Sequence, residues 1–105
     1  MIREKKRYIV FEIVSEQEFN FDDVKKGLTE NLLRYIGEFG FEKTSLYVVK
    51  NLYNHNKGIL RVSNQMLTEC KASFAKMDSL AGTRVKINVI GISGILKKAK
   101  YKFLR

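Results

Sequence analysis

The chain has 105 residues and carries 20 Lys or Arg against 11 Asp or Glu, which gives a formal net charge of +9. No run of about 18 apolar residues is present, so the sequence excludes a membrane-spanning helix. The single cysteine, Cys70, excludes an internal disulfide and fits a reducing compartment, so we expect one cytoplasmic domain over residues 1–105.

The first predicted elements are a strand and a helix. Residues 7–14 are rich in β-branched and aromatic side chains, which indicates a strand. Asn20 is a suitable N-cap for a helix that begins near Phe21, and Gly40 is its expected end. The apolar positions at helical spacing in this segment are Val24, Leu28, Leu32, Tyr35, Ile36 and Phe39.

The middle of the chain predicts a hairpin, a second helix and a last strand. Residues 46–52 are expected to form a strand, and the polar segment 54–58 is expected to turn the chain into a strand over 59–62. A helix capped by Ser63 or Asn64 runs to about Leu80. Apolar and polar residues then alternate over 83–92, which predicts another strand.

The last predicted element is a short basic helix. Beyond Gly94 the apolar residues Ile95, Ala99 and Phe103 recur at four-residue spacing, with lysines between them. The full order is strand, helix, strand, strand, helix, strand and tail helix. This order is typical of an α+β sandwich of the RNA-recognition-motif or ferredoxin-like type, with two helices on one face of a four-stranded antiparallel sheet. The residues expected to line the buried face are Ile9, Phe11, Ile13, Val85, Ile87 and Val89.

The positive charge is concentrated at the two ends of the chain. Residues 79–105 contain seven bases and no acid, and residues 3–7 have a net charge of +3. The segment between them, 8–78, has nine bases and ten acids. This asymmetry indicates a polyanionic partner. For the tail helix itself, a solvated helix packed on the domain and a helix lying on a membrane surface are the alternatives to nucleic-acid contact.

Clustered catalytic groups are absent from the sequence. His55 lies in a polar turn without an evident base or metal partner, and Cys70 lies on the apolar stripe of a helix. Asp22 and Asp23 are explained by a helix N-terminus, where acids are favourable. The segment 91–94 resembles a phosphate-binding loop only loosely, and a bend between strand and helix is the simpler interpretation.

The face of the sheet without helices is expected to carry Arg61, Arg84 and Lys86 beside Tyr8 and Asn88. A base-stacking RNA-recognition motif would have aromatic residues in its third strand, and this strand has none. We therefore expect phosphate contacts, with a steep dependence on salt.

Three segments resemble one known family. They are Arg-Tyr-Ile-Val-Phe-Glu-Ile at 7–13, Gly-Ile-Leu-Arg-Val at 58–62, and Gly-Ile-Ser-Gly-Ile-Leu-Lys-Lys at 91–98 continuing into Lys-Phe-Leu at 102–104. In order and spacing they are similar to the small protein subunit shared by archaeal and eukaryotic ribonuclease P (the Pop five type), and the likeness covers almost the whole chain. The family often has Thr where this chain has Ile95. The lack of acidic extensions resembles the archaeal members.

The resemblance implies an activity and partners. The protein would join a ribonucleoprotein endonuclease that removes 5′ leaders from precursor tRNA, binding and stabilising its catalytic RNA. The RNA subunit would carry the active site with magnesium, and the protein would bind no cofactor and not cut by itself. A barrel-shaped protein subunit (the Rpp thirty type) would be its close partner, in a dimer of heterodimers.

Two sets of site residues follow as hypotheses. The residues expected to contact RNA phosphates are Arg7, Arg61, Arg84, Lys86, Lys97, Lys98, Lys100 and Lys102. The apolar residues expected either to meet the partner protein or to lie under the tail helix are Val10, Tyr47, Val49 and Ile59. A stand-alone RNA- or DNA-binding module, acting as a chaperone or regulator, is the alternative function. A small ferredoxin-like acyl-phosphate hydrolase would need a phosphate cradle that the sequence lacks.

Overall fold

A computed structural model describes residues 5–103 of the chain. The helices are α1 (Phe21–Thr44), α2 (Leu67–Ala75), α3 (Leu96–Phe103) and the short 3-10 helices η1 (Lys50–Leu52) and η2 (Asn64–Met66). The strands are β1 (Lys6–Val14), β2 (Tyr47–Val48), β3 (Lys57–Ser63), β4 (Ser79–Leu80), β5 (Thr83–Arg84) and β6 (Lys86–Ser93).

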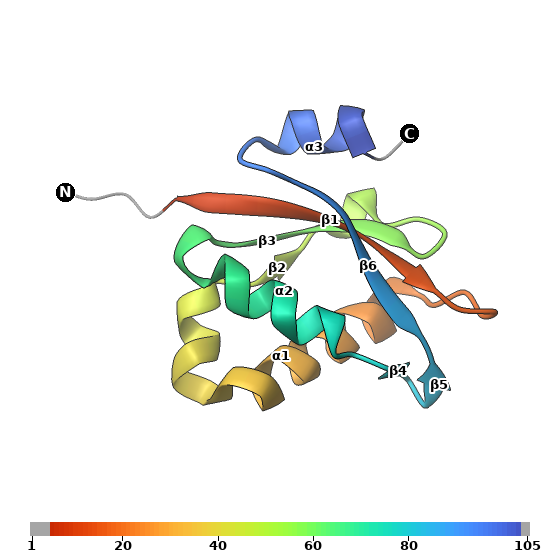
Figure 1. Ribbon diagram of the computed structural model, residues 1–105. Coiled ribbons are helices and arrows are strands. Elements are labelled where there is room, and N and C mark those ends of the chain that lie inside the picture. Colours follow the sequence, from red (N-terminus) through yellow and green to blue (C-terminus); the bar gives the residue numbers. More distant parts are fainter. Residues whose placement is uncertain (1–4, 104–105) are drawn as a thin grey trace.

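A four-stranded antiparallel sheet in the order β2-β3-β1-β6 separates two layers of helix. Helices α1 and α2 lie against one face, and α3 lies on the opposite face (Figure 1). The strands β4 and β5 pair as a small separate ribbon before β6. The predicted RNA-recognition-motif-like sandwich is confirmed, and the long α1 and short α2 form its helical layer.

Alternation along β1 and β6 builds the main core. Ile9, Phe11 and Ile13 are buried under the helices, as are Val85 and Ile87, while Val89 of β6 is partly buried against the same core. A β-bulge at Ile90 interrupts the register between these strands, because Phe11 pairs with Val89 while Val10 pairs with Gly91. The extra residue shifts the side-chain phase of β6, so that Ile92 also packs against the core.

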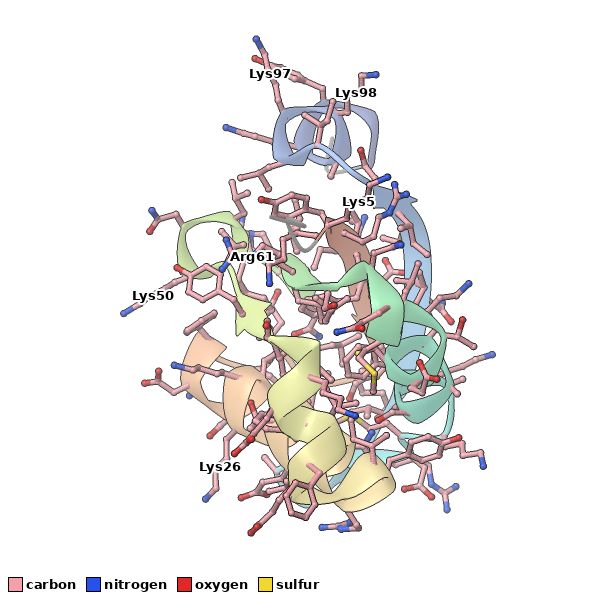
Figure 2. The ribbon with its side chains drawn as sticks, turned by 90° about the vertical axis from the view of Figure 1, so that its left-hand side faces the viewer. Lys5, Lys26, Lys50, Arg61, Lys97 and Lys98 are labelled. Carbon is pink, nitrogen blue, oxygen red and sulfur yellow. The ribbon has the colours of Figure 1, made fainter. Side chains whose placement is uncertain are left out.

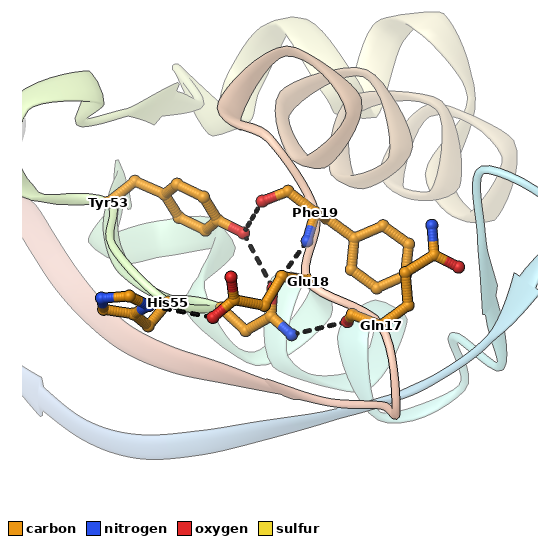
Figure 3. A network of polar contacts seen from close by, with 6 residues as sticks. Gln17, Glu18, Phe19, Tyr53 and His55 are labelled. Atoms are coloured by element: carbon orange, nitrogen blue, oxygen red, sulfur yellow. Dashed lines mark hydrogen bonds and ion pairs between the residues drawn. The ribbon is translucent and has the colours of Figure 1, made fainter.

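A polar network holds the loop after β1 against the β2–β3 turn (Figure 3). Asn56 donates from Nδ2 to the carbonyl oxygen of Gln17 at 2.9 Å and accepts at Oδ1 from the backbone N–H of Phe19 at 2.9 Å. The Tyr53 hydroxyl donates to the Phe19 carbonyl oxygen at 2.6 Å. Burial, and secondarily the nearby Glu18 carboxylate, raises the pKa of Tyr53 against the lowering effect of a hydrogen bond from the Asn56 backbone, so the phenol stays protonated.

The turn itself is a two-residue hairpin loop. His55 and Asn56 both have positive φ, 48° and 62°, which is the geometry of a type I′ turn. Reciprocal backbone hydrogen bonds between Asn54 and Lys57 close it at 2.8 and 3.0 Å. The next residue, Gly58, lies opposite Phe11, and a Cβ there would come within 3.0 Å of the Phe11 and Tyr53 rings. The turn predicted at 54–58 is therefore confirmed.

The prediction that Gly40 ends the first helix is wrong. The helix breaks at Gly37, whose φ of 77° and ψ of 173° are not helical, and then continues to Thr44. The break changes which side chains face inward beyond it. Phe39, placed on the apolar stripe by its spacing, is 87% exposed, while Phe41 packs against the core.

Two further boundaries differ from the prediction. The expected strand 46–52 is reduced to β2, because the chain turns into η1 directly after Val49 donates to the Ile59 carbonyl oxygen. The second helix ends at Ala75, well before Leu80. Leu80 is nonetheless buried, because β4 carries it to Gly27 of α1. A short strand thus delivers the apolar contact that the pattern assigned to a longer helix.

Cys70 is completely buried in α2, as its place on the apolar stripe predicted. Burial, and secondarily the Glu69 carboxylate, raises the pKa of its thiol from 9.0 to about 12. As pH rises, the thiol ionises in the unfolded chain before it ionises in the folded protein. Ionisation therefore stabilises the unfolded state, and the free energy of unfolding falls between the ordinary pKa and the raised one. From about pH 8 to about pH 10 this costs about 1.4 kcal/mol.

Denaturant unfolding of the wild type and Cys70→Ala at those two pH values tests this expectation. The wild type should lose about 1.4 kcal/mol more unfolding free energy than the variant over the interval. Equal losses in the two proteins would contradict it.

Candidate nucleic-acid interface

Helix α3 is seated on the open face of the sheet. Its Ala99 is completely buried against Val10 of β1 and Ile59 of β3, which are completely buried as well. Four partly buried side chains surround this second core: Tyr8, Val49, Leu52 and Leu96. The small alanine lets the helix approach the strands closely, so the charged residues on either side of it point away from the sheet.

The segment between β6 and α3 forms a bend. The Ser93 hydroxyl accepts from the backbone N–H of Ile95 and lies 3.1 Å from the carbonyl oxygen of the same residue. A Cβ on Gly94 would lie 3.0 Å from Nη1 of Arg7, so the guanidinium packs closely against the bend. Arg7 also donates from Nε to Oδ1 of Asn64 at 2.9 Å. These contacts fix the direction in which α3 leaves the sheet.

Lysines form the outer surface of α3. Lys97, Lys98 and Lys100 are exposed, and no acidic residue occurs on this helix. Figure 2 shows Lys97 and Lys98 pointing away from the body of the molecule, at the end opposite to Lys26 of α1. The side chain of Lys102 lies outside the described residues. The arrangement presents several flexible ammonium groups on one rigid support, which suits contact with successive phosphates.

Arg61 lies in a row of side chains that crosses the sheet beside α3. The register places Tyr47, Arg61 and Tyr8 next to one another on β2, β3 and β1. The Arg61 guanidinium carbon is 5.1 Å from the centre of the Tyr47 ring, a cation–π contact. Its Nε is buried and makes no hydrogen bond within the described part of the chain. The Tyr47 ring therefore helps to keep the guanidinium beside the edge strand β2.

Arg84 and Lys86 lie apart from this surface. Both are exposed, but Arg84 belongs to the β4–β5 ribbon and Lys86 begins β6. The strand carries the chain about 26 Å from there to the bend before α3, at about 3.3 Å per residue. The structure thus brings Arg61, Arg7 and the tail lysines to one end of the molecule and leaves Arg84 and Lys86 at the other.

The four residues expected to meet a partner protein or the tail helix divide between these outcomes. Val10 and Ile59 lie under α3 with no exposed surface, so they offer nothing to a partner. Val49 packs against the same cluster and is partly buried. Tyr47 is 51% exposed, and its ring makes the cation–π contact with Arg61. Coverage by the tail helix is therefore what the structure shows for the first two.

Sequence reasoning missed two residues at this end of the molecule. Lys50 of η1 is exposed on the same side as Arg61 in Figure 2. Tyr101 of α3 is 65% exposed between the tail lysines. Tyr101 could have been found as an aromatic residue placed among bases, the usual composition of a surface that binds single-stranded nucleic acid. Lys50 carried no signal, because the segment around it reads as a strand.

Other chemistry finds little support in the described residues. His55 lies in a solvated turn as predicted, but it has a carboxylate partner that the sequence did not reveal: its Nδ1 lies 2.9 Å from Oε1 of Glu18, and both side chains are largely exposed. Within residues 5–103, no three His, Cys, Asp or Glu side chains are grouped so that they could hold a metal ion. No helix in the same range is long and apolar enough to cross a membrane.

The fold and the site together define a class: a small α/β sandwich of the RNA-recognition-motif type whose open sheet face is covered by a basic helix. Within that class, residues 7–104 match the model of the Rpp14/Pop5 family. The chain therefore belongs to the Rpp14/Pop5 family, and the resemblance seen in the sequence is confirmed.

Curated relatives and a solved structure agree with this assignment. The chain is 34% identical over 103 residues to ribonuclease P protein component 2 of Pyrococcus furiosus, covering 98% of this chain and 86% of the relative. It is 37% identical to the component 2 protein of Methanococcus vannielii, covering 98% and 78%. A chain in the cryo-EM structure of yeast ribonuclease MRP has a TM-score of 0.70 at 15% identity, covering 90% of this chain and 77% of that chain, which supports the fold.

Proposed function

We propose that this chain is a protein subunit of ribonuclease P that binds the catalytic RNA of the enzyme. The observation that carries the proposal is the position of α3, which the second core fixes on the sheet with Lys97, Lys98 and Lys100 outward. Membership of the Rpp14/Pop5 family and the archaeal relatives named ribonuclease P protein component 2 support it. The protein would act in the cytoplasm, together with its RNA, as one domain over residues 1–105.

The contribution of the protein is electrostatic. A catalytic RNA must bring its own phosphates close to those of precursor tRNA, and this repulsion opposes both folding and substrate binding. Ammonium and guanidinium groups on α3 and β3 would neutralise part of that charge and release bound counterions. The 5′ leader would be removed at an RNA active site that holds magnesium. This chain would supply no catalytic group.

Their positions divide the basic residues expected to contact RNA into two groups. Lys97, Lys98, Lys100 and Arg61 lie on the α3 side of the sheet and would act together. Arg7 has the same parity as Ile9 and reaches the bend before α3 from the side of the other helices, so it would contact only RNA that extends around this end of the sheet. Arg84 and Lys86 would contact phosphates only if the RNA extends along β6 to its far end. Lys102 remains part of the proposal through its place in the acid-free stretch of the sequence.

The protein partners are also a proposal. A barrel-shaped subunit of the same enzyme would bind this chain, and two such pairs would assemble as a dimer of heterodimers. Because Val10 and Ile59 are covered by α3, the contact would use other residues, with Tyr47 and the exposed part of Val49 still available at the edge strand.

Reconstitution tests the proposed function. Precursor tRNA cleavage would be measured at low magnesium with the cognate ribonuclease P RNA and the barrel-shaped partner, with and without this chain. We expect cleavage at lower magnesium when the chain is present, because its cations replace part of the metal requirement. Cleavage that is independent of the chain, together with purification of mixed RNA instead of one structured RNA, would favour a stand-alone RNA-binding module.

A further inference from the structure

An open groove of about 470 Å³ runs between η1 and α3. Its walls combine apolar, aromatic and basic side chains from two segments that are distant in the sequence. The lining residues are Val49, Asn51, Leu52, Leu96, Lys97, Lys100 and Tyr101. A volume of this size lies within the range of roughly 300–1,000 Å³ that is usual for small-molecule sites.

The lining has the chemistry of a nucleotide site. Leu52 and Leu96 form an apolar floor over the second core, and Tyr101 offers a ring that is 65% exposed at the side. Lys97 and Lys100 stand on the α3 side of the groove, and none of the residues between 5 and 103 that line it is acidic. An apolar, aromatic floor suits the flat face of a base, and ammonium groups beside it suit the phosphate attached to that base.

We propose that this groove binds one unpaired nucleotide of RNA, with its base stacked on Tyr101 and its phosphate between Lys97 and Lys100. The proposal deepens the proposed function, on which it rests, by naming the kind of RNA segment that this end of the molecule takes. A base held inside a duplex is stacked on both faces and cannot enter, so the groove selects a loop, a bulge or a strand end.

The neighbouring row on the sheet extends the path for a single strand. Tyr47 lies two residues before Val49 on the same edge, and Arg61 lies two residues after Ile59, so both are about 7 Å further along the strands. The Arg61 guanidinium, 5.1 Å from the centre of the Tyr47 ring, offers a second planar group on which a base can stack. Two stacking positions flanked by lysines fit an extended RNA strand better than an apolar side chain of a protein.

Fluorescence anisotropy with the wild-type chain and Tyr101→Ala tests the groove. The probes are a labelled oligouridylate of about 12 nucleotides and an RNA duplex of equal length, at one salt concentration. Loss of one stacked base should weaken oligouridylate binding roughly fivefold to 150-fold. Duplex binding should stay unchanged, because no charge is removed. Tyr101→Phe keeps the ring and should bind like the wild type.

Tyr35→Ala is the matched control, since Tyr35 is an exposed tyrosine on α1 in the opposite layer. Equal oligouridylate binding by Tyr101→Ala and the wild type would overturn the groove site, as would an equal loss in Tyr35→Ala. Loss of partner-protein binding with RNA binding unchanged would assign the groove to a protein contact and also overturn it.

Reconstituted cleavage separates this proposal from the proposed function. If the wild-type chain lowers the magnesium requirement and Tyr101→Ala binds oligouridylate normally, the proposed function stands and the groove site fails. If the wild-type chain leaves cleavage unchanged while Tyr101→Ala loses oligouridylate binding, the proposed function fails and the groove site stands.

Discussion

Replacement of Lys97, Lys98 and Lys100 by alanine together should remove most of the RNA affinity of this chain. All three side chains are exposed on the outer face of α3 and lie outside the second core, so the fold should be unaffected. Removing one lysine–phosphate interaction lowers the slope of log K against log salt by about 0.7–0.9, so the triple variant should show a slope smaller by roughly 2–3. Titration of ribonuclease P RNA at several salt concentrations measures it.

The control is a triple alanine variant at Lys25, Lys26 and Lys43. It removes the same charge from exposed positions of α1, in the layer on the other side of the sheet. Because long-range attraction depends on net charge, both variants should associate more slowly with RNA. Only the α3 variant should show the smaller slope. Equal slopes for the two variants would show that the charge acts without regard to its position.

The substitution Ala99→Asp should detach α3 from the sheet. Ala99 is completely buried against Val10 and Ile59, and a carboxylate there would have no polar partner among the contacts that the structure describes. The carboxylate can reach water most easily if α3 detaches from the sheet, because the main core under α1 and α2 does not depend on this helix. We expect the free energy of unfolding to fall by about 2–3 kcal/mol. Faster amide exchange confined to α3 and weaker RNA binding should accompany this change.

Lys98→Asp puts the same carboxylate on the outer face of the same helix. It should weaken RNA binding through charge alone and leave the α3 amides as protected as in the wild type. Unchanged exchange of α3 in Ala99→Asp would mean that this helix is not held by the second core.

The fold was largely predictable because local patterns and the tertiary structure agree. Apolar and polar residues alternate in 7–14 and 83–92 because one face of the sheet is buried. The positive-φ turn at His55 and Asn56 uses residue types that tolerate this backbone geometry. A glycine permits the break at Gly37, but Gly27 and Gly40 lie in the same helix without breaking it, so the sequence does not select the position. The Ile90 bulge depends on the pairing of β6 with β1. Each moves apolar side chains to a different face, which the spacing of apolar residues does not predict.

The sequence predicted which residue types make up the candidate site, but not how those residues are arranged on the surface. The acid-free C-terminal segment identified the cations, because charge asymmetry can be read directly from residue types. It could not show that Arg84 and Lys86 lie at the far end of β6, since sequence proximity says nothing about the length of a strand across the molecule. The sequence left open whether a partner protein or the tail helix covers Val10 and Ile59. The packing of Ala99 against them shows that the tail helix does.

The proposed function depends above all on the lysine face of α3 being the surface that meets RNA. Chemical acetylation of lysines, mapped by mass spectrometry with and without bound ribonuclease P RNA, reports on that surface residue by residue. We expect strong protection of Lys97, Lys98 and Lys100 by RNA, with Lys25 and Lys26 of α1 modified as readily as in the free protein. Protection of the α1 lysines, with those of α3 reacting at their free rate, would refute this placement of the RNA.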